Sequence, residues 1–239
     1  MRSLHSRKAA MRRPVRIAIP LAILAFLAAA AAAFAASIPV YSNDMASSGA
    51  RSQLVHLGGG KCKRGGGGRA LSVTVGKRTR ECKMATPVVG ANLDIKVTAR
   101  LGQNTPSNLQ KKVFVAVSVR DGGGGQYQLA VFPGKGTYQL RRDLPPDGGR
   151  TLLAKGKGGK IKGVGKPNKL RLQAFATADG GERVTVFVNG AKLASVVDDA
   201  HTASALGGRS STVSVGAKKA DKGARASFDD LSVAVPDPF

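Results

Sequence analysis

Alternation of apolar and polar residues in short runs is the feature that most constrains the fold of this chain. The pattern is clearest over 71–75, 93–100, 169–176 and 184–188, where every second residue is apolar. A period of two places successive side chains on opposite faces of a β-strand, so each run predicts a strand with one buried face. Residues 113–117 are apolar throughout, which predicts a strand buried on both faces.

Glycine-rich segments separate these runs and predict turns between antiparallel strands. The strongest hairpin signal is Asn189-Gly190, which lies between the runs 184–188 and 192–197. At Asp229-Asp230 the alternation changes parity, which predicts a β-bulge. Outside the N-terminal segment, no window longer than ten residues has a helical period. The pattern therefore predicts an all-β, antiparallel sandwich or barrel, with 37–239 as a single domain.

The first 36 residues have the organisation of an export signal. Six basic residues and no acid stand before Ile17, an apolar stretch follows, and Ala33-Phe34-Ala35 forms a small-x-small end. This organisation predicts a signal peptide, and the alternative is an uncleaved membrane anchor over Ile17–Ala36. We therefore expect a secreted or cell-surface protein that contacts the membrane only through this segment, if it is not cleaved.

The predicted export determines the oxidation state that we expect for the two cysteines, Cys62 and Cys82. In an oxidising compartment a disulfide between them is the default expectation. The alternatives are a reactive thiol or a metal pair, but no histidine stands near either cysteine in the sequence.

The chain is strongly basic, with 38 lysines and arginines against 14 acids and a net charge of +24. Eight of these 38 residues are six lysines in a segment that contains many glycines and no acid, and two arginines before it. These polyanion-binding candidates are Lys155, Lys157, Lys160, Lys162, Lys166 and Lys169, with Arg141 and Arg142. Lysines and accessible backbone amides suit an anionic envelope polymer, an acidic polysaccharide or anionic lipid, whereas the alternative is a solvated basic loop. Aromatic residues make up 5% of the chain and tryptophan is absent, so we predict no dedicated nucleic-acid role.

The carboxylates do not form a recognisable catalytic pattern. Glycoside hydrolysis needs two closely placed carboxylates, but the only glutamates, Glu81 and Glu182, are isolated in the sequence. We therefore predict a protein that is not an enzyme. No cofactor is expected, and calcium is the alternative because two aspartate pairs could supply oxygen ligands. These weak metal candidates are Asp198, Asp199, Asp229 and Asp230, which otherwise mark a turn and the bulge.

Several motifs in the C-terminal half, taken in order, resemble a known superfamily. They are Gln126-Tyr127-Gln128-Leu129, Asn168-Lys169-Leu170, Val186-Phe187-Val188-Asn189-Gly190 and Ser227-Phe228-Asp229-Asp230-Leu231-Ser232-Val233. The segment resembles the concanavalin A-like lectin/glucanase superfamily, and within it the exported bacterial laminin-G-like jelly-roll domains. This resemblance implies a jelly-roll β-sandwich and export, but no single activity, because the superfamily includes sugar binders, glycoside hydrolases and adhesion modules.

Together these features predict an exported, non-catalytic domain that binds carbohydrate or an anionic cell-envelope polymer through loops and a sheet face. The alternatives are a glycoside-acting enzyme of the same superfamily and a purely structural cell-surface module. Tyr127 and Tyr138 share strand parity with neighbouring leucines, so we expect both rings in the core.

Overall fold

A computed structural model describes residues 37–57, 61–67, 69–76, 79–121, 125–144, 149–199, 210–217 and 223–236. The predicted signal peptide or anchor, residues 1–36, lies outside the described residues. Within the described ranges, no helix has the length and apolar character needed to cross a bilayer.

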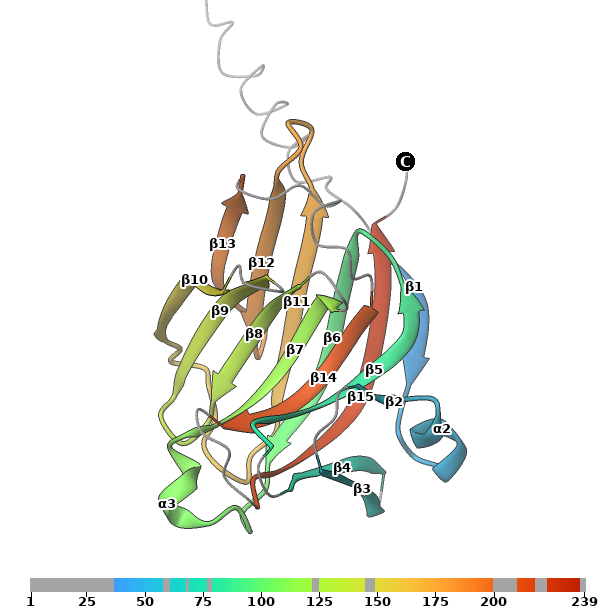
Figure 1. The fold of residues 1–239 in the computed structure, drawn as a ribbon, viewed down its shortest axis with the longest axis vertical. Helices are drawn as coiled ribbons and strands as arrows, with labels where there is room; N and C mark the ends of the chain where they lie inside the picture. The colour runs from blue at the N-terminus through green and yellow to red at the C-terminus, as the bar shows by residue number, and fades with distance from the viewer. Residues whose placement is uncertain are drawn as a thin grey trace, which may run out of the picture. The chain divides into compact units, whose positions relative to one another are not determined.

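Two antiparallel sheets contain nearly all the regular structure (Figure 1). In order, sheet A contains β13 (Ala191–Asp198), β12 (Glu182–Val188), β11 (Asn168–Ala176), β6 (Leu93–Leu101), β15 (Arg225–Pro236), β4 (Ala70–Val75) and β3 (Cys62–Gly67), and β1 (Ser37–Asn43) also pairs with β15. Sheet B contains β10 (Gly149–Lys157), β9 (Thr137–Leu144), β8 (Gln126–Phe132), β7 (Val113–Asp121), β14 (Ser210–Ala217), β5 (Glu81–Val89) and β2 (Val55–Leu57). Two short helices, α2 (Ser48–Ser52) and α3 (Ser107–Gln110), lie in connections. The predicted antiparallel sandwich is confirmed.

The core lies between the sheets and is made by the inward side chains of both. In sheet B, β7 is buried along its whole length, as its apolar run predicted. Tyr127 and Tyr138 belong to the same core, which confirms that these rings are not surface platforms. In sheet A, alternate residues of β11 and β12, such as Leu172 and Val186, are buried against them.

Both predicted irregularities of the backbone are present. Asn189 and Gly190 have φ values of 50° and 82°, the left-handed conformation that a two-residue type I′ hairpin requires. Asp230 has a φ of 48°, and the pairing of β15 with β6 shifts register between Asp229 and Ser232. The bulge at Asp229-Asp230 is therefore confirmed.

The predicted Cys62–Cys82 disulfide is present and joins the two sheets. Cys62 begins β3 in sheet A, whereas Cys82 lies in β5 of sheet B, and their Cα atoms are 5.8 Å apart. The bond therefore connects the sheets where the chain crosses from one to the other.

Candidate functional site on the outer face of sheet B

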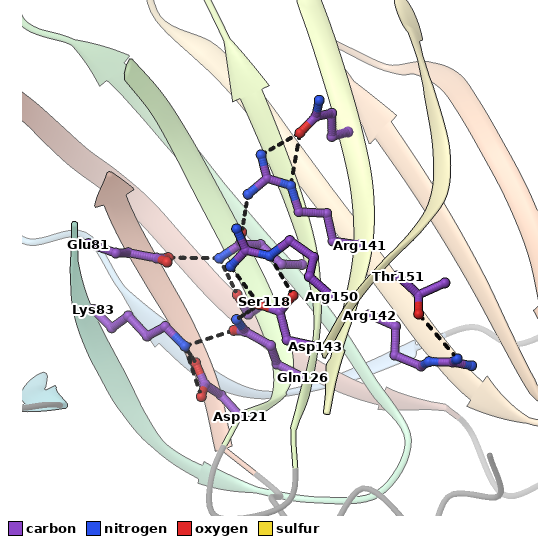
Figure 2. Close-up of polar contacts among 12 residues, drawn as sticks. Glu81, Lys83, Ser118, Asp121, Gln126, Arg141, Arg142, Asp143, Arg150 and Thr151 are labelled. Atoms are coloured by element: carbon purple, nitrogen blue, oxygen red, sulfur yellow. Dashed lines mark hydrogen bonds and ion pairs between the residues drawn. The ribbon is translucent and has the colours of Figure 1, made fainter. Parts of the chain in front are cut away.

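The outer face of sheet B, which faces away from sheet A, carries a polar network (Figure 2). Alternation along β9 explains why. Because Tyr138 and Leu140 point into the core, Gln139, Arg141 and Asp143 point outward. The same parity in β8 turns Tyr127, Leu129 and Val131 inward. It places the other residues of the strand outward, namely Gln126, Gln128, Ala130 and Phe132.

A cleft with a volume of about 450 Å³ lies on this face. It is lined by Arg80, Glu81, Phe114, Gln139, Arg141, Arg150, Leu152 and Ala217. Three of these residues are arginines and one is a carboxylate, so the lining carries an excess of positive charge. Such a cleft suits an anionic ligand.

Arg141 is the most constrained cation in the cleft. Its guanidinium lies 5.2 Å from the ring centre of Phe114 and 5.7 Å from that of Phe132. It donates hydrogen bonds to the side-chain oxygens of Gln139 and Gln128. Burial lowers the pKa of Arg141, and the nearby charge of Arg150 lowers it further. Arg141 is 4% exposed, and these acceptors are neutral amides, so among the described residues its charge is not paired directly with a carboxylate.

Beside Arg141, a second group of side chains is already charge-paired. Arg150 donates two hydrogen bonds to Asp143, at 2.7 and 3.0 Å, and Gln126 donates a third at 2.8 Å. Burial raises the pKa of Asp143, but the hydrogen bonds from Arg150 and Gln126 outweigh it and bring that pKa below its usual value. Lys83 is paired with Asp121 at 2.9 Å. This group therefore frames the cleft rather than offering unpaired charge.

Glu81 is the one carboxylate among the described residues that line the cleft. Its Oε1 accepts hydrogen bonds from Gln128 at 2.7 Å and from Ser214 at 2.6 Å. Gln128 therefore connects the two charges, because its nitrogen donates to Glu81 while its oxygen accepts from Arg141. Such a network orients each polar group before a ligand arrives.

The predicted polyanion candidates are divided among three parts of the molecule. Arg141 lines the cleft, and Lys155 and Lys157 lie on the same outward side, since Gly156 between them faces the ring of Tyr138. The connection between β10 and β11 contains Lys160, Lys162 and Lys166, whereas Lys169 lies on β11 of sheet A. The lysine-rich segment 155–169 was expected to be one basic loop, but its first residues belong to β10 and its last residues belong to β11.

The structure contradicts the prediction that Arg142 contacts a ligand at the surface, because its side chain points between the sheets. It is buried and forms an ion pair with Asp198, which also accepts a 2.9 Å hydrogen bond from the hydroxyl of Tyr127. Neighbours on a strand face opposite sides, so Arg141 and Arg142 cannot both reach the same ligand. Asp198, a calcium candidate, is likewise engaged inside the sandwich.

The four aspartates suggested for calcium do not come together. Asp198 ends β13 and Asp199 follows it, whereas Asp229 and Asp230 lie in β15, four strand spacings away in sheet A. At the usual strand spacing this separates the two pairs by about 19 Å across the sheet, and they also lie toward opposite ends of β11, level with Ala176 and Lys169. In the part of the chain that the structure describes, no group of three or more metal-ligating side chains is found.

The sequence alone did not identify Glu81 and Gln139 in the lining of the cleft, or Gln128 beneath it. A usable signal was present, because Gln126-x-Gln128 and Gln139-x-Arg141-x-Asp143 alternate with core residues. Two consecutive strands with polar outward positions predict a polar sheet face.

Comparisons with known proteins give likeness in structure only. No family model and no curated protein match the sequence. Among solved structures, a Bacillus subtilis protein of unknown function with a galectin-like fold is 13% identical, with a TM-score of 0.60 over 85% of this chain and 100% of the other. An endo-1,3-beta-glucanase from Streptomyces sioyaensis is 13% identical, with a TM-score of 0.55 over 84% and 97%. The carbohydrate-binding module CBM66 from Bacillus subtilis is 10% identical, with a TM-score of 0.53 over 76% and 95%. Together with the two antiparallel sheets, these matches show that the chain has the concanavalin A-like jelly-roll fold.

Proposed function

We propose that this protein binds an acidic polysaccharide, without catalysis, in the cleft on the outer face of sheet B. The observation that carries the proposal is Arg141, a buried guanidinium held by neutral amides and two aromatic rings. A planar guanidinium matches a carboxylate in geometry, and a carboxylate on the ligand would form the direct ion pair that Asp143 and Glu81, which act on Arg141 only through longer-range attraction, do not form.

The rest of the outer face supports the same class of ligand. Gln139 lines the cleft and its amide carries both donors and an acceptor, which suit sugar hydroxyls, whereas the buried Gln128 holds Glu81 and Arg141 in place. Lys155 and Lys157 on the edge strand β10 add positive charge beside the cleft, which speeds the arrival of an anionic polymer. Two of the similar structures are named as a carbohydrate-binding module and a glucanase, so carbohydrate is also a ligand class of this fold.

Binding without catalysis is supported by the carboxylates of the lining. Hydrolysis of a glycosidic bond uses two carboxyl groups on either side of the bond, about 5–10 Å apart. Glu81 alone has this chemistry among the lining residues, and it is engaged by Gln128 and Ser214. We expect no release of reducing ends when the protein is incubated with the polymers that it binds.

The proposal is tested by measuring binding of the purified protein to polygalacturonate and to a neutral β-glucan, at low and high salt. We expect binding to polygalacturonate that weakens with salt. Arg141→Gln should lower the affinity about tenfold or more, because a hydrogen bond to a charged group contributes about 1.5–3 kcal/mol. The affinity of Arg141→Lys should lie between those of the wild type and Arg141→Gln, since lysine keeps the charge but lacks the planar guanidinium.

The matched control is Lys111→Gln, which removes one exposed positive charge beside α3, outside the cleft. It should keep the wild-type affinity. An equal loss in both variants would show that binding depends on net charge rather than on the cleft, and would overturn the proposal. Binding to neither polymer would also overturn it and favour a structural module.

A further inference from the structure

The outer face of sheet A contains a second groove, on the other side of the sandwich from the cleft. Its volume is about 370 Å³. Its lining includes Lys96, Lys169, Arg171, Phe187, Asp230 and Ser232. None of these residues belongs to the site on sheet B.

Arg171 is the fixed centre of this groove. It donates hydrogen bonds to Asp94 from Nε at 2.9 Å and from Nη2 at 2.6 Å, and its guanidinium lies 5.2 Å from the ring centre of Phe187. Asp94 is fully buried, whereas a third of the Arg171 side chain remains exposed. The guanidinium is therefore held in one position with an edge open to solvent.

Strand register places further cations in line with Arg171. Lys96 on β6 lies directly opposite Arg171, Phe187 on β12 lies on its other side, and Lys192 on β13 is opposite Phe187. The row Lys192, Phe187, Arg171 and Lys96 thus crosses four neighbouring strands. With strands about 4.8 Å apart, its cations recur every 5–10 Å or so along a line perpendicular to the strands.

Much of this positive charge is not neutralised by the fold. Asp94 pairs with Arg171 and lies 3.8 Å from Lys96, and Asp230 accepts a hydrogen bond from Thr98. For Lys169 and Lys192 no ion pair is found among the described residues. A linear polymer with regularly spaced anionic groups would meet a cation at each of several positions along the row.

The chemistry of the groove favours an acidic glycan over a nucleic acid. The guanidinium of Arg171 already lies over the Phe187 ring, so the face that it covers is not open to stacking by a base. Asp230, Thr98 and Ser232 offer oxygens to sugar hydroxyls.

We propose that this groove is a second binding site for acidic polysaccharide, so that one molecule bridges two polymer chains. The ligand class rests on the proposed function of the cleft. The two sites lie on opposite outer faces of the sandwich, so a short oligosaccharide in one site cannot reach the other. Two polymer chains, one in each site, are therefore cross-linked by a single protein molecule.

The test measures how many molecules of a trigalacturonate bind per protein chain, and whether the protein cross-links polygalacturonate, followed by light scattering. The groove variant is Lys96→Gln/Lys169→Gln, the cleft variant is Arg141→Gln, and a third protein combines them. The control, Lys111→Gln/Lys112→Gln, also loses two exposed lysines, but outside both sites. Thermal unfolding of each variant checks that it remains folded.

The wild-type protein and the control should bind two trigalacturonates and raise the scattering of polygalacturonate. The groove and cleft variants should each bind one and lose the cross-linking, and the combined variant should bind none. One bound trigalacturonate in the wild type, lost only in the cleft variant, would overturn the second site and leave the proposed function standing. Binding lost in the groove variant but unchanged in the cleft variant would overturn the proposed function instead.

Discussion

At the scale of single residues, the ion pair between Arg120 and Glu182 is buried between the sheets. The atoms Nη2 and Oε2 are 2.6 Å apart, and the side chains are 1% and 0% exposed. Burial raises the pKa of Glu182, and the hydrogen bond from Arg120 opposes this rise. Removing one partner of such a pair leaves a buried charge without its counter-ion, which costs about 3–5 kcal/mol.

We therefore expect Glu182→Gln to lower the free energy of unfolding in urea by about 3–5 kcal/mol. The double variant Arg120→Met/Glu182→Leu should recover most of this loss, because it removes both charges and keeps the volume. If Glu182→Gln is as stable as the wild type, the pair does not hold this part of the core.

Tyr127 links the buried charges to alkaline stability. Burial is the main cause that raises the pKa of Tyr127 far above its ordinary value, and the hydrogen bond to Asp198 adds to it. The folded state therefore keeps a proton that the unfolded chain releases near pH 10. The stabilisation is complete below that pH and declines as the pH rises above it, by up to about 1.4 kcal/mol per pH unit.

Tyr127→Phe removes this titration together with the hydrogen bond. We expect the variant to be less stable than the wild type at neutral pH, by about 1–3 kcal/mol. Its free energy of unfolding should then fall less steeply above pH 10 or so. Chemical unfolding over a series of pH values measures both effects, and equal slopes in the two proteins would contradict the linkage.

At the scale of elements, two asparagines hold the connection between β10 and β11. The side chain of Asn189 accepts a hydrogen bond from the backbone of Lys169 and donates to the carbonyl of Lys160 and to Asn168. Asn168 in turn bonds both the amide and the carbonyl of Lys162. A hairpin residue thus orders the lysine-rich segment beside it.

Replacing Asn189 separates backbone from side-chain effects. Asn189→Gly keeps the left-handed conformation and loses the three hydrogen bonds, whereas Asn189→Ala also pays about 1–2 kcal/mol for that conformation. We expect both variants to be less stable, and alanine to be the worse by roughly this amount. Thermal unfolding measures the order, and an alanine variant as stable as the glycine variant would contradict it.

The elements also show what the sequence could predict. Strands with strict alternation, such as β6 and β12, were recognisable because their period reports one buried face. The strand β5 was missed because Pro87 and a break in alternation at Ala85 interrupt its pattern. Asn189-Gly190 predicted the hairpin, but the partners of the Asn189 side chain lie 20 or more residues away in sequence, where no local pattern reports them.

The candidate site was less predictable, because it depends on which residues share a face. In the sequence, the adjacent Arg141 and Arg142 suggest one basic pair. Because neighbours on a strand face opposite sides, however, Arg141 lines the cleft and Arg142 pairs with Asp198 inside the sandwich. Parity with Tyr138 and Leu140 would have separated them. Glu81 could not be found in this way, because it reaches Gln128 from β5 and that strand was not recognised.

At the scale of the whole molecule, the charge is distributed over two faces rather than gathered in one patch. Lys155 and Lys157 accompany the cleft of sheet B, whereas Lys169 lines the groove of sheet A. The connection between these strands passes from one sheet to the other, so neighbours in sequence end on opposite faces. A net charge alone predicts attraction to anionic polymers, whereas the fold determines that the basic residues lie on two faces of the sandwich.

The disulfide completes the sandwich where apolar packing is thin. The strand β3 has the sequence Cys-Lys-Arg-Gly-Gly-Gly, and of its described side chains Cys62 is the one that packs against the core. The bond to Cys82 therefore provides the main covalent and apolar attachment of this edge to sheet B. Closing a loop of this length contributes about 3 kcal/mol through the entropy of the unfolded chain.

We expect Cys62→Ala/Cys82→Ala to lower the melting temperature by about 6–12 °C, at about 2–4 °C per kcal/mol for a domain of this size. The wild-type protein in reducing buffer should melt close to the double variant, and added reductant should not change the variant. Amide hydrogen exchange should accelerate most in β3 and its neighbour β4, which the disulfide holds, and least in β7, which lies at the centre of sheet B and is buried along its whole length. Equal melting of oxidised and reduced protein would show that the hydrogen bonds between β3 and β4 suffice to hold this edge.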